Sequence, residues 1–427
     1  MITKPLAVFV PWLHMHQPPI WVGEGEEGRL IGNLEKMLHG PENSEERWNA
    51  GWYARAYLNP AHYVQRLSAQ GYAPRLMLDY SGVLLEELDK LSHDGTFANY
   101  HVQGEPLGNV IAQLRKMLAE YPEAVEFAGT AYSHCYFPAT PERDHEAQIM
   151  EWRAVFAELF GEKALARVRG FWLPEMGMLG DGIEALRLVR LIKKCGYEWV
   201  ILPASALERP ADWSTVQLEN QVHRLVIAAE GEGEEILCVV RDTEMGIRQQ
   251  SGQNADGCIG TARQRGAALK QTNTQTPALV VPTSDGENGN VMMFEFFPNG
   301  FAPLFENQAH WPEVEFLTVS QYLDKYLPDG PTSQVRLAAG GGSWIGGHHS
   351  WKAGERRVQV LEAVEQLSRD VAQARLGASP RDEWALEQAA HALLVCETSC
   401  YVYWDSEFWT EQAYRCLGWA RTLLPTP

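Results

Sequence analysis

Short apolar runs alternate with amphipathic segments along most of this chain, and this rhythm predicts an α/β fold. Residues 6–16 ("LAVFVPWLHMH") read as a buried strand that ends in polar groups, and residues 74–82 ("PRLMLDYSG") as a second strand. Helical periodicity covers residues 59–70, 83–93 and 182–196, and strand patterns return at 166–177 and 197–205. Repeated β-then-α units favour a parallel sheet closed, or nearly closed, into a barrel.

Two stretches depart from this rhythm. Residues 220–245 carry two β-rich runs around an acidic, glycine-containing turn, which predicts an inserted β-hairpin. From about residue 313 the composition shifts to helical periodicity, as in residues 355–376 and 382–397. We therefore expect a catalytic α/β domain over residues 1–312 and an α-helical domain over residues 313–427.

Composition and charge narrow the range of partners. The chain has 36 basic and 55 acidic side chains, a net charge of -19, which disfavours nucleic acid and anionic membrane surfaces. Seven scattered cysteines form no C-x-x-C pair, and the N-terminal residues lack the apolar core and cleavage site of a signal peptide. We expect a cytoplasmic protein with a neutral or cationic substrate.

Polar side chains cluster where the expected strands end. In a barrel these ends converge on one face, so residues distant in sequence can line a single pocket. The clusters comprise His14, His16 and Gln17 in "HMHQP"; His134 in "GTAYSH"; Trp172 and Glu175 in "GFWLPEMG"; and Asp285 and Glu287 in "SDGENG".

The two carboxylate motifs each have a structural and a functional interpretation. Glu175 could begin a helix or pair with Arg169, and "SDGENG" could be a plain turn, since Asp, Asn and Gly are common turn formers. The full spacing of a calcium-binding loop is absent. The functional interpretation places Glu175 and Asp285 across one pocket as the carboxylate pair that a glycosidase needs.

The "HMHQP" motif is open to three interpretations. His14 and His16 lie two residues apart on a strand and point the same way, as do ligands of a divalent cation in metal-dependent hydrolases or deacetylases. Alternatively, one histidine is buried in the core and the other exposed. In the third interpretation both imidazoles hydrogen-bond to sugar hydroxyls.

The four motifs in this order resemble the conserved regions of glycoside hydrolase family 57. The segment "GGSWIGGHHSWKAGERR", which contains Trp344, also resembles the Gly-Ser-Trp segment of amylase-like members. The resemblance implies an incomplete (β/α)7 barrel followed by a C-terminal helical domain, α-1,4-glucan substrates, and a retaining mechanism with no metal or other cofactor. It assigns Glu175 as nucleophile and Asp285 as general acid/base.

Further residues are carried over from the same resemblance. His14, His16 and His134 match substrate-site histidines that donate hydrogen bonds to hydroxyls, and Trp172 matches a position that stacks on a sugar or shapes the pocket. Gln17, Glu287 and Trp344 are expected to contact substrate. Many members carry Ser-Asp-Trp in the last conserved region, whereas this chain has Cys400 where Asp is expected; Glu397 or Asp405 could substitute.

Retaining hydrolysis requires the Glu175 carboxylate to be charged and the Asp285 carboxyl to hold its proton, with the two groups roughly 5 to 5.5 Å apart. The motifs are shared by amylases and 4-α-glucanotransferases, so the sequence leaves hydrolysis and transfer open. A branching enzyme or an α-galactosidase of the same family, and a metal-dependent hydrolase or deacetylase using His14 and His16, remain alternatives. The sequence does not fix the oligomeric state; a homodimer is one option.

Overall fold

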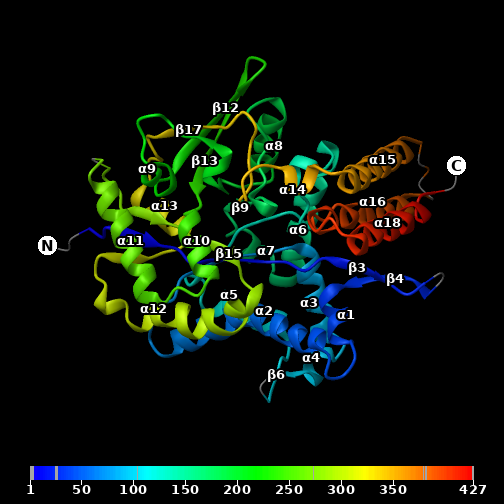
Figure 1. Ribbon diagram of the computed structural model, residues 1–427, viewed down its shortest axis with the longest axis horizontal. Coiled ribbons are helices and arrows are strands. Elements are labelled where there is room, and N and C mark those ends of the chain that lie inside the picture. The colour runs from blue at the N-terminus through cyan, green and yellow to red at the C-terminus, as the bar shows by residue number, and fades with distance from the viewer. Residues whose placement is uncertain are drawn as a thin grey trace.

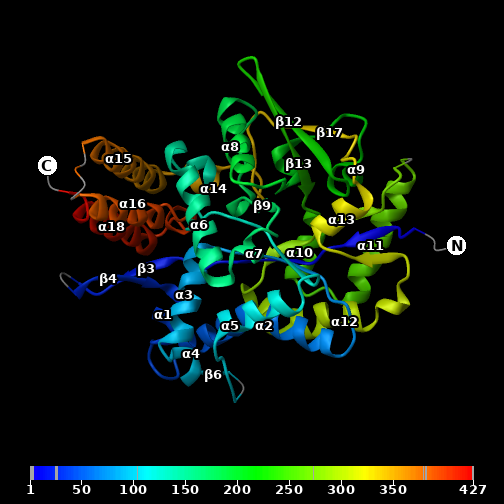
Figure 2. The ribbon, with the colours of Figure 1, turned by 180° about the vertical axis from the view of Figure 1, so that it is seen from behind.

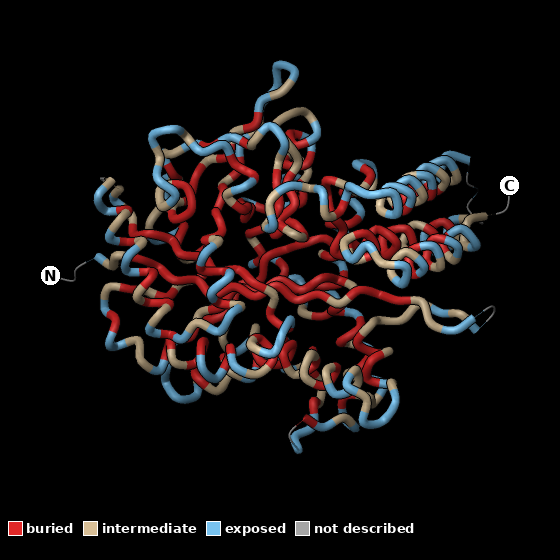
Figure 3. Tube along the Cα trace, viewed as in Figure 1, coloured by how far each residue is buried: buried red, intermediate tan, exposed pale blue. Residues whose placement is uncertain are grey.

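The computed structural model describes residues 4–24, 27–102, 104–272, 274–377, 379 and 382–425. Most of the strands lie in the middle of the molecule with helices around them, and a few hairpins project at the edges (Figure 1). The buried parts of the chain run along these strands, whereas the outward-facing turns of the helices are exposed (Figure 3). The apolar runs of the sequence thus form the interior, as expected from the burial of apolar area.

Two small parallel sheets carry the N-terminal strand segments. The first has the order β14–β1–β16, from β14 (Ala278–Val280), β1 (Ala7–Phe9) and β16 (Val314–Phe316). The second has the order β15–β2–β5–β8, from β15 (Thr283–Asp285), β2 (Trp12–Met15), β5 (Leu76–Tyr80) and β8 (Val125–Phe127). Every residue of β1, β2 and β5 is buried, and all of them are apolar except His14 in β2 and Asp79 in β5.

A larger mixed sheet follows. Its order is β11–β17–β12–β13–β10–β9, from β11 (Leu207–Glu208), β17 (Gln334–Leu337), β12 (His223–Ala229), β13 (Glu232–Val240), β10 (Trp199–Leu202) and β9 (Gly170–Trp172). Strands β12 and β13 pair antiparallel as a hairpin, and β13 also pairs with β10 in parallel. The second strand of this hairpin therefore belongs to the sheet rather than projecting from it.

Single links join these sheets. Gly129, just beyond β8, bridges in parallel to Phe171 of β9, and the amide of Asp242 after β13 donates to Val281 O at 3.1 Å. The strands therefore follow one another around the centre of the molecule, but their hydrogen-bonded pairing is divided among three separate sheets. The observed class is α/β, and the incomplete (β/α)7 barrel stays a prediction.

Helices follow most of the strands and cover their outer side (Figures 1 and 2). The longer ones are α2 (Glu45–Ala69), α3 (Gly82–His93), α5 (Val110–Glu120), α6 (His145–Phe160), α8 (Ile183–Lys194), α10 (Thr243–Gln250), α11 (Ala255–Lys270) and α13 (Val319–Tyr326). Shorter ones are α1 (Asn33–Leu38), α4 (Thr96–Asn99), α7 (Glu162–Leu165), α9 (Thr215–Glu219), α12 (Ala302–Glu306) and α14 (His349–Lys352). A π-helical stretch spans Val291–Phe301, and two hairpins pair β3 (Pro19–Val22) with β4 (Arg29–Gly32) and β6 (His101–Val102) with β7 (Glu105–Pro106).

Local sequence explains where several helices begin. The Ser44 hydroxyl caps α2 by accepting from the amide of Arg47 at 3.1 Å. Thr318 and Gln321 form a reciprocal capping box at the start of α13. Such caps satisfy the first amides of a helix, which have no partner within the helix.

The C-terminal part is a group of helices that lies against the strand-rich part (Figures 1 and 2). It contains α15 (Glu355–Gly377), α16 (Glu383–Cys396), α17 (Cys400–Tyr403) and α18 (Glu407–Thr422). The Tyr401 hydroxyl donates to Pro19 O at 3.0 Å, and the amide of Trp21 donates to Gln412 Oε1 at 2.6 Å. The β3–β4 hairpin, which follows β2 in the chain, thus attaches to these helices.

The division into residues 1–312 and 313–427 stays a prediction. Strands β16 and β17 lie after residue 312, yet they pair with β1 and with β12, respectively. Over the described parts of the chain, no helix combines the length and the apolar character needed to cross a membrane.

Candidate active site

The strand register brings two of the predicted chemical groups together with a third, Asp79, that was not predicted. His14 on β2 lies opposite Asp285 on β15 and opposite Asp79 on β5. All three strands are parallel, so their carboxyl ends meet at one edge. The histidine motif and the second carboxylate motif therefore share one site, as the convergence of strand ends predicts.

A buried ion pair fixes the charge of His14. Its Nδ1 contacts Asp79 Oδ1, and the indole of Trp12 donates to Asp79 Oδ2 at 2.6 Å. Burial lowers the pKa of His14, but the charge and hydrogen bond of Asp79 outweigh it, and the net pKa rises to about 9. His14 is consequently an imidazolium at neutral pH.

His16 and His134 behave in the opposite way. Their rings stack with centroids 4.1 Å apart and planes inclined by 9°, and their Nδ1 atoms contact the hydroxyls of Ser81 and Ser399, each at 2.8 Å. Burial, followed by the neighbouring histidines, holds both pKa values well below the ordinary value. Both rings are therefore neutral, and each buried Nε2 has no hydrogen-bond partner among the residues that the structure describes.

Trp172 forms part of the wall of the site. Its ring stacks on His14 with centroids 4.0 Å apart and an interplanar angle of 16°, and Trp344 meets it edge-on at 5.8 Å. One indole face is thus covered by protein, and the side chain is fully buried. The arrangement fits the pocket-shaping alternative for Trp172 better than an open sugar platform.

Glu175 lies in a strained turn directly after β9. It has φ 59° and ψ 13°, and the next residue, Met176, also has a positive φ of 48°. Non-glycine residues rarely adopt this region, and such strain collects at functional sites. The apolar strand GFW followed by Pro174 leads the chain into this turn, which aims the carboxyl inward.

Both carboxyl oxygens of Glu175 have a donor. Oε2 accepts from the Trp344 indole at 2.9 Å, and Oε1 lies 3.3 Å from the Ser399 hydroxyl. Burial and then the charge of Asp285 raise the pKa of Glu175 to about 7, although His14, Trp344 and Ser399 oppose this. Burial and Asp285 thus favour the protonated carboxyl more than in an ordinary Glu, and the charged state expected of Glu175 during the reaction stays a prediction.

Arg169 does not pair with Glu175. Its guanidinium instead contacts Glu198 at 2.8 Å and Asp324 at 2.9 Å. The structural interpretation of Glu175 as an Arg169 ion pair is therefore wrong.

The "SDGENG" turn carries two carboxyls with different surroundings. Asp285 is half-buried and accepts from the Asn288 amide at 3.3 Å, whereas Glu287 is buried with one oxygen 3.4 Å from the amide of His16. Burial and Asp285 raise the pKa of Glu287 to about 8. Gly286 lets the turn pack closely against Met15, because a Cβ at position 286 would lie 2.2 Å from the Met15 methyl carbon.

Gln17 lies at the edge of this group. It is half-buried, and its side-chain oxygen accepts from the amide of Asn33 at 2.9 Å. The structure thus brings His14, His16, His134, Trp172, Glu175, Glu287 and Trp344 into one connected cluster, with Asp285 facing it and Gln17 beside it.

Sequence reasoning missed four residues of this cluster. Asp79 and Arg241 are polar residues at the ends of apolar strands, a signal present in "LMLDY" and "CVVRD". The Arg241 guanidinium lies 5.3 Å from the Trp344 ring centroid, and burial lowers its pKa to about 10, so it remains a cation. Ser399 and Tyr403 come from the C-terminal helices and carry no comparable signal; Glu175 and Asp285 both raise the pKa of Tyr403, after burial.

The last conserved region lies behind Glu175. Cys400 is half-buried, and burial followed by Glu175 raises the pKa of its thiol to about 12. The two substitutes considered for the missing Asp have other partners. Glu397 accepts from Gln148 at 2.7 Å and Asp405 pairs with Arg357 at 3.2 Å, so Ser399 is the residue of this region that contacts Glu175.

The histidine geometry is poorly suited to a metal ion. Within the described ranges, no three His, Cys, Asp or Glu side chains are arranged to hold one. His14 Nδ1 is taken by Asp79 and His16 Nδ1 lies against Ser81, so both of these nitrogens already have protein partners. The donor set thus departs from the convergent one that a catalytic metal needs.

Carboxyls on two different strand ends, surrounded by buried imidazoles and indoles, define an enzyme site of the kind that processes glycosidic bonds. The sequence model of glycosyl hydrolase family 57 matches residues 12–331, most of the chain, and the chain belongs to this family. The resemblance drawn from the four motifs is confirmed, and the protein is an enzyme of the glycoside hydrolase and glycosyl-transfer class.

Solved structures support the same fold. A family 57-type branching enzyme from Pyrococcus horikoshii has a TM-score of 0.70 at 18% identity, covering 97% of this chain and 88% of its own. The 4-α-glucanotransferase of Thermococcus litoralis has a TM-score of 0.61 at 16% sequence identity, and the match covers 100% of this chain and 61% of that enzyme. An α-amylase from Thermotoga maritima has a TM-score of 0.62 at 11% sequence identity, and the match covers 99% of this chain and 93% of the amylase. Comparison with curated proteins gave no match.

Proposed function

We propose that this chain is a retaining enzyme acting on α-1,4-glucans, as an amylase-type hydrolase or a 4-α-glucanotransferase. Glu175 is the nucleophile and Asp285 the general acid/base. The observation that carries the proposal is the placement of Glu175: a strained turn holds a buried carboxyl between the Trp344 indole and the Ser399 hydroxyl, and Asp285 lies close enough to interact with it electrostatically.

The proposed reaction has two displacements. In the first, the Glu175 carboxylate attacks the anomeric carbon while Asp285 gives its proton to the departing glycosidic oxygen. In the second, Asp285 takes a proton from water or from a sugar hydroxyl, and that oxygen displaces Glu175. The acceptor alone separates hydrolysis from transfer. The predicted separation of the two carboxyls, about 5 to 5.5 Å, belongs to this mechanism.

Charges around the pair suit this chemistry. The His14 imidazolium stabilises ionised Glu175, and it also attracts Asp285 and Glu287. Arg241 adds a second buried cation beside Trp344. Fixed charges and dipoles of this kind stabilise developing charge in a water-poor site.

The wider architecture is part of the proposal. Residues 1–312 form the incomplete (β/α)7-type unit and residues 313–427 complete the cleft, which is supported by the contacts of Trp344 and Ser399 with Glu175.

A cytoplasmic location stays a prediction. Branching and α-galactosidase activities differ from the leading proposal only in substrate and acceptor, and the metal-dependent alternative is disfavoured by the histidine geometry.

Product analysis with maltoheptaose tests the activity. In buffer with EDTA, wild type should yield both shorter and longer oligosaccharides. The ratio of longer to shorter products measures transfer relative to hydrolysis. Glu175→Gln and Asp285→Asn should yield neither product. Glu198→Gln, a carboxyl removed from an exposed ion pair with Arg169, is the matched control and should act as wild type.

Azide separates the two roles when an activated α-glycosyl substrate is used. With Glu175→Ala, azide replaces the missing carboxylate and should give the β-glycosyl azide. With Asp285→Ala, azide attacks the glycosyl-enzyme from the opposite face and should give the α-glycosyl azide. Full activity of either carboxyl variant on maltoheptaose would remove that residue from the mechanism.

A further inference from the structure

The Ser399 hydroxyl lies between two groups of the site. Its oxygen is 2.8 Å from His134 Nδ1 and 3.3 Å from Glu175 Oε1, and the side chain is 1% exposed. Ser399 comes from the turn between α16 and α17, whereas His134 and Glu175 follow β8 and β9. A residue of the C-terminal helices thus connects the two.

Counting hydrogens around this oxygen allows two arrangements, because a hydroxyl donates once. When Glu175 is ionised, Ser399 must donate to Glu175, and His134 Nδ1–H must donate to Ser399. The neutral imidazole then has a bare Nε2, which is an acceptor. When Glu175 is protonated, its hydrogen can go to Ser399, Ser399 can donate to Nδ1, and His134 carries its hydrogen on Nε2.

We infer that Ser399 is a positioning residue that couples the ionisation of Glu175 to the tautomer of His134. In going from the protonated to the ionised state, one proton leaves the site, the Ser399 hydrogen turns from His134 to Glu175, and the imidazole hydrogen moves from Nε2 to Nδ1. In the ionised state His134 accepts a hydrogen bond from ligand through Nε2. This differs from the donor role expected from the sequence, and it rests on the proposed role of Glu175.

The free Nε2 supports this coupling. It is buried and has no hydrogen-bond partner within the described chain, so its donor or acceptor character is available to a ligand. His134 also has a positive φ of 61°, a backbone conformation that is maintained only where its surroundings demand it. Burial keeps the ring neutral, which the tautomer exchange requires.

The turn that carries Ser399 is held from behind. Its amide donates to His134 O at 3.1 Å, and Thr398 bridges to Cys135. Gln148 donates to Glu397 Oε2 at 2.7 Å and accepts from the amide of Ser133 at 3.0 Å. Gln148, which is buried, therefore links the turn that carries Ser399 to the segment that carries His134.

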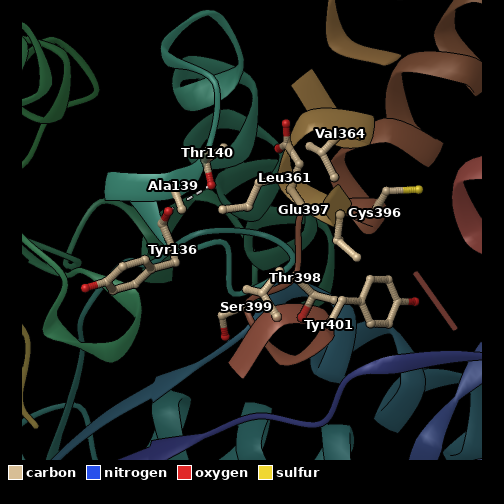
Figure 4. A pocket seen from close by; sticks show the side chains of 12 residues that line it. Tyr136, Ala139, Thr140, Leu361, Val364, Cys396, Glu397, Thr398, Ser399 and Tyr401 are labelled. Carbon is tan, nitrogen blue, oxygen red and sulfur yellow. Dashed lines mark hydrogen bonds between the residues drawn. The ribbon is translucent and has the colours of Figure 1, made fainter. Parts of the chain in front are cut away.

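Figure 4 shows a hollow next to this turn; Glu397, Thr398 and Ser399 line it from successive positions of the chain, together with Tyr136, Ala139 and Thr140 from the segment after β8. Burial, then Asp144, raises the pKa of Glu397 well above its ordinary value. Glu397 thus anchors the turn through Gln148, and its burial opposes a negative charge behind Glu175.

Other titratable groups also face Glu175. They are Asp285 and His14 from neighbouring strands, His134 and Tyr136 from the segment after β8, and Cys400 and Tyr403 from α17. Of these, His134 is joined to Glu175 through the shared Ser399 hydroxyl, which gives that pair a proton-sensitive link. The other groups act on Glu175 through their charges or dipoles.

The first test needs no substrate. ¹⁵N NMR of the full-length protein, with His134 signals assigned by their loss in His134→Gln, reports which imidazole nitrogen carries hydrogen between about pH 5.5 and about 8.5. In wild type the tautomer should change along with the ionisation of Glu175, and in Glu175→Gln it should not change. A single tautomer across the range in wild type overturns the inference.

The second test uses kinetics with maltoheptaose. Ser399→Ala should lower kcat roughly ten- to a hundredfold, since it removes one hydrogen bond to a charged group. It should also move the acidic limb of kcat/KM to higher pH, because that hydrogen bond favours ionised Glu175. Thr398→Val is the matched control, which removes a neighbouring buried hydroxyl without a partner in the described residues and should leave both readouts unchanged.

The outcomes are distinct. An unshifted acidic limb in active Ser399→Ala overturns the inference and leaves the proposed reaction intact. Absence of activity in wild type contradicts the proposed function, while the NMR titration still decides the coupling. If Ser399→Ala does not fold, wild type and Glu175→Gln alone complete the first test.

Discussion

Replacing Asp79 by Asn should destabilise the protein in a pH-dependent way. Asp79 is fully buried beside His14, and the substitution keeps the shape of the side chain while removing its charge. The His14 imidazolium then loses its partner in a site where burial already disfavours it. His14 should become neutral at pH 7.

The size of the effect follows from the pKa of His14. A shift from 6.5 in the unfolded chain to about 9 in the folded protein contributes about 3 kcal/mol of stability at pH 7. Burial raises the pKa of Asp79 itself, so relief of that cost offsets part of the loss. We expect Asp79→Asn to lower the free energy of unfolding by roughly 2 to 3 kcal/mol at pH 7.

The sign of the pH dependence is fixed by the raised pKa. A raised pKa contributes stability that is fully present below the unfolded value of 6.5 and is lost as pH rises through about 9. Urea unfolding at several pH values should therefore show the two proteins converging above pH 9. Asp324→Asn, which removes the same charge from an exposed ion pair with Arg169, should cost less than about 1 kcal/mol. A pH-independent loss would refute the charged state of His14.

Three further outcomes are expected. The kcat/KM of wild type on maltoheptaose should rise through an acidic limb with a pKa of about 7, the value that burial gives Glu175; a limb near the ordinary value for Glu would contradict this. Trp344→Phe should lower kcat roughly ten- to a hundredfold and raise the pKa of the acidic limb, because it removes the indole that donates a hydrogen bond to Glu175. Glu287→Gln should become more thermostable relative to wild type as pH rises from the ordinary value for Glu toward about 8, because over this range Glu287 ionises in the unfolded chain while the buried carboxyl keeps its proton; equal melting temperatures at every pH would contradict the raised pKa.

Much of the site could be predicted from sequence because strand ends carry a local signal. His14, Glu175 and Asp285 each follow an apolar, β-forming run, and parallel strands deliver their ends to one edge. Asp79 carries the same signal, and its pairing with His14 could not be seen because register depends on which strands become neighbours. The β12–β13 hairpin was visible as two β-rich runs, whereas the parallel pairing of β13 with β10 was not.

Charge states were beyond the reach of sequence. His14 and His16 are two residues apart, yet one imidazole is held positive by Asp79 and the other is held neutral by burial. The same residue type is thus charged at one position of this segment and neutral two residues later. Desolvation and partner charge set a pKa, and both depend on atoms brought in from other elements.

The sequence by itself determined the family, the α/β class and the order of the strand-end motifs, since these rest on local periodicity and on the spacing of residues along the chain. Only the tertiary structure decided that Trp344 and Ser399 reach Glu175 from a region more than 165 residues later, as the separations of 169 and 224 residues record. Hydrogen bonds form wherever packing brings donor and acceptor within about 3 Å, and chain packing is a property of the whole molecule.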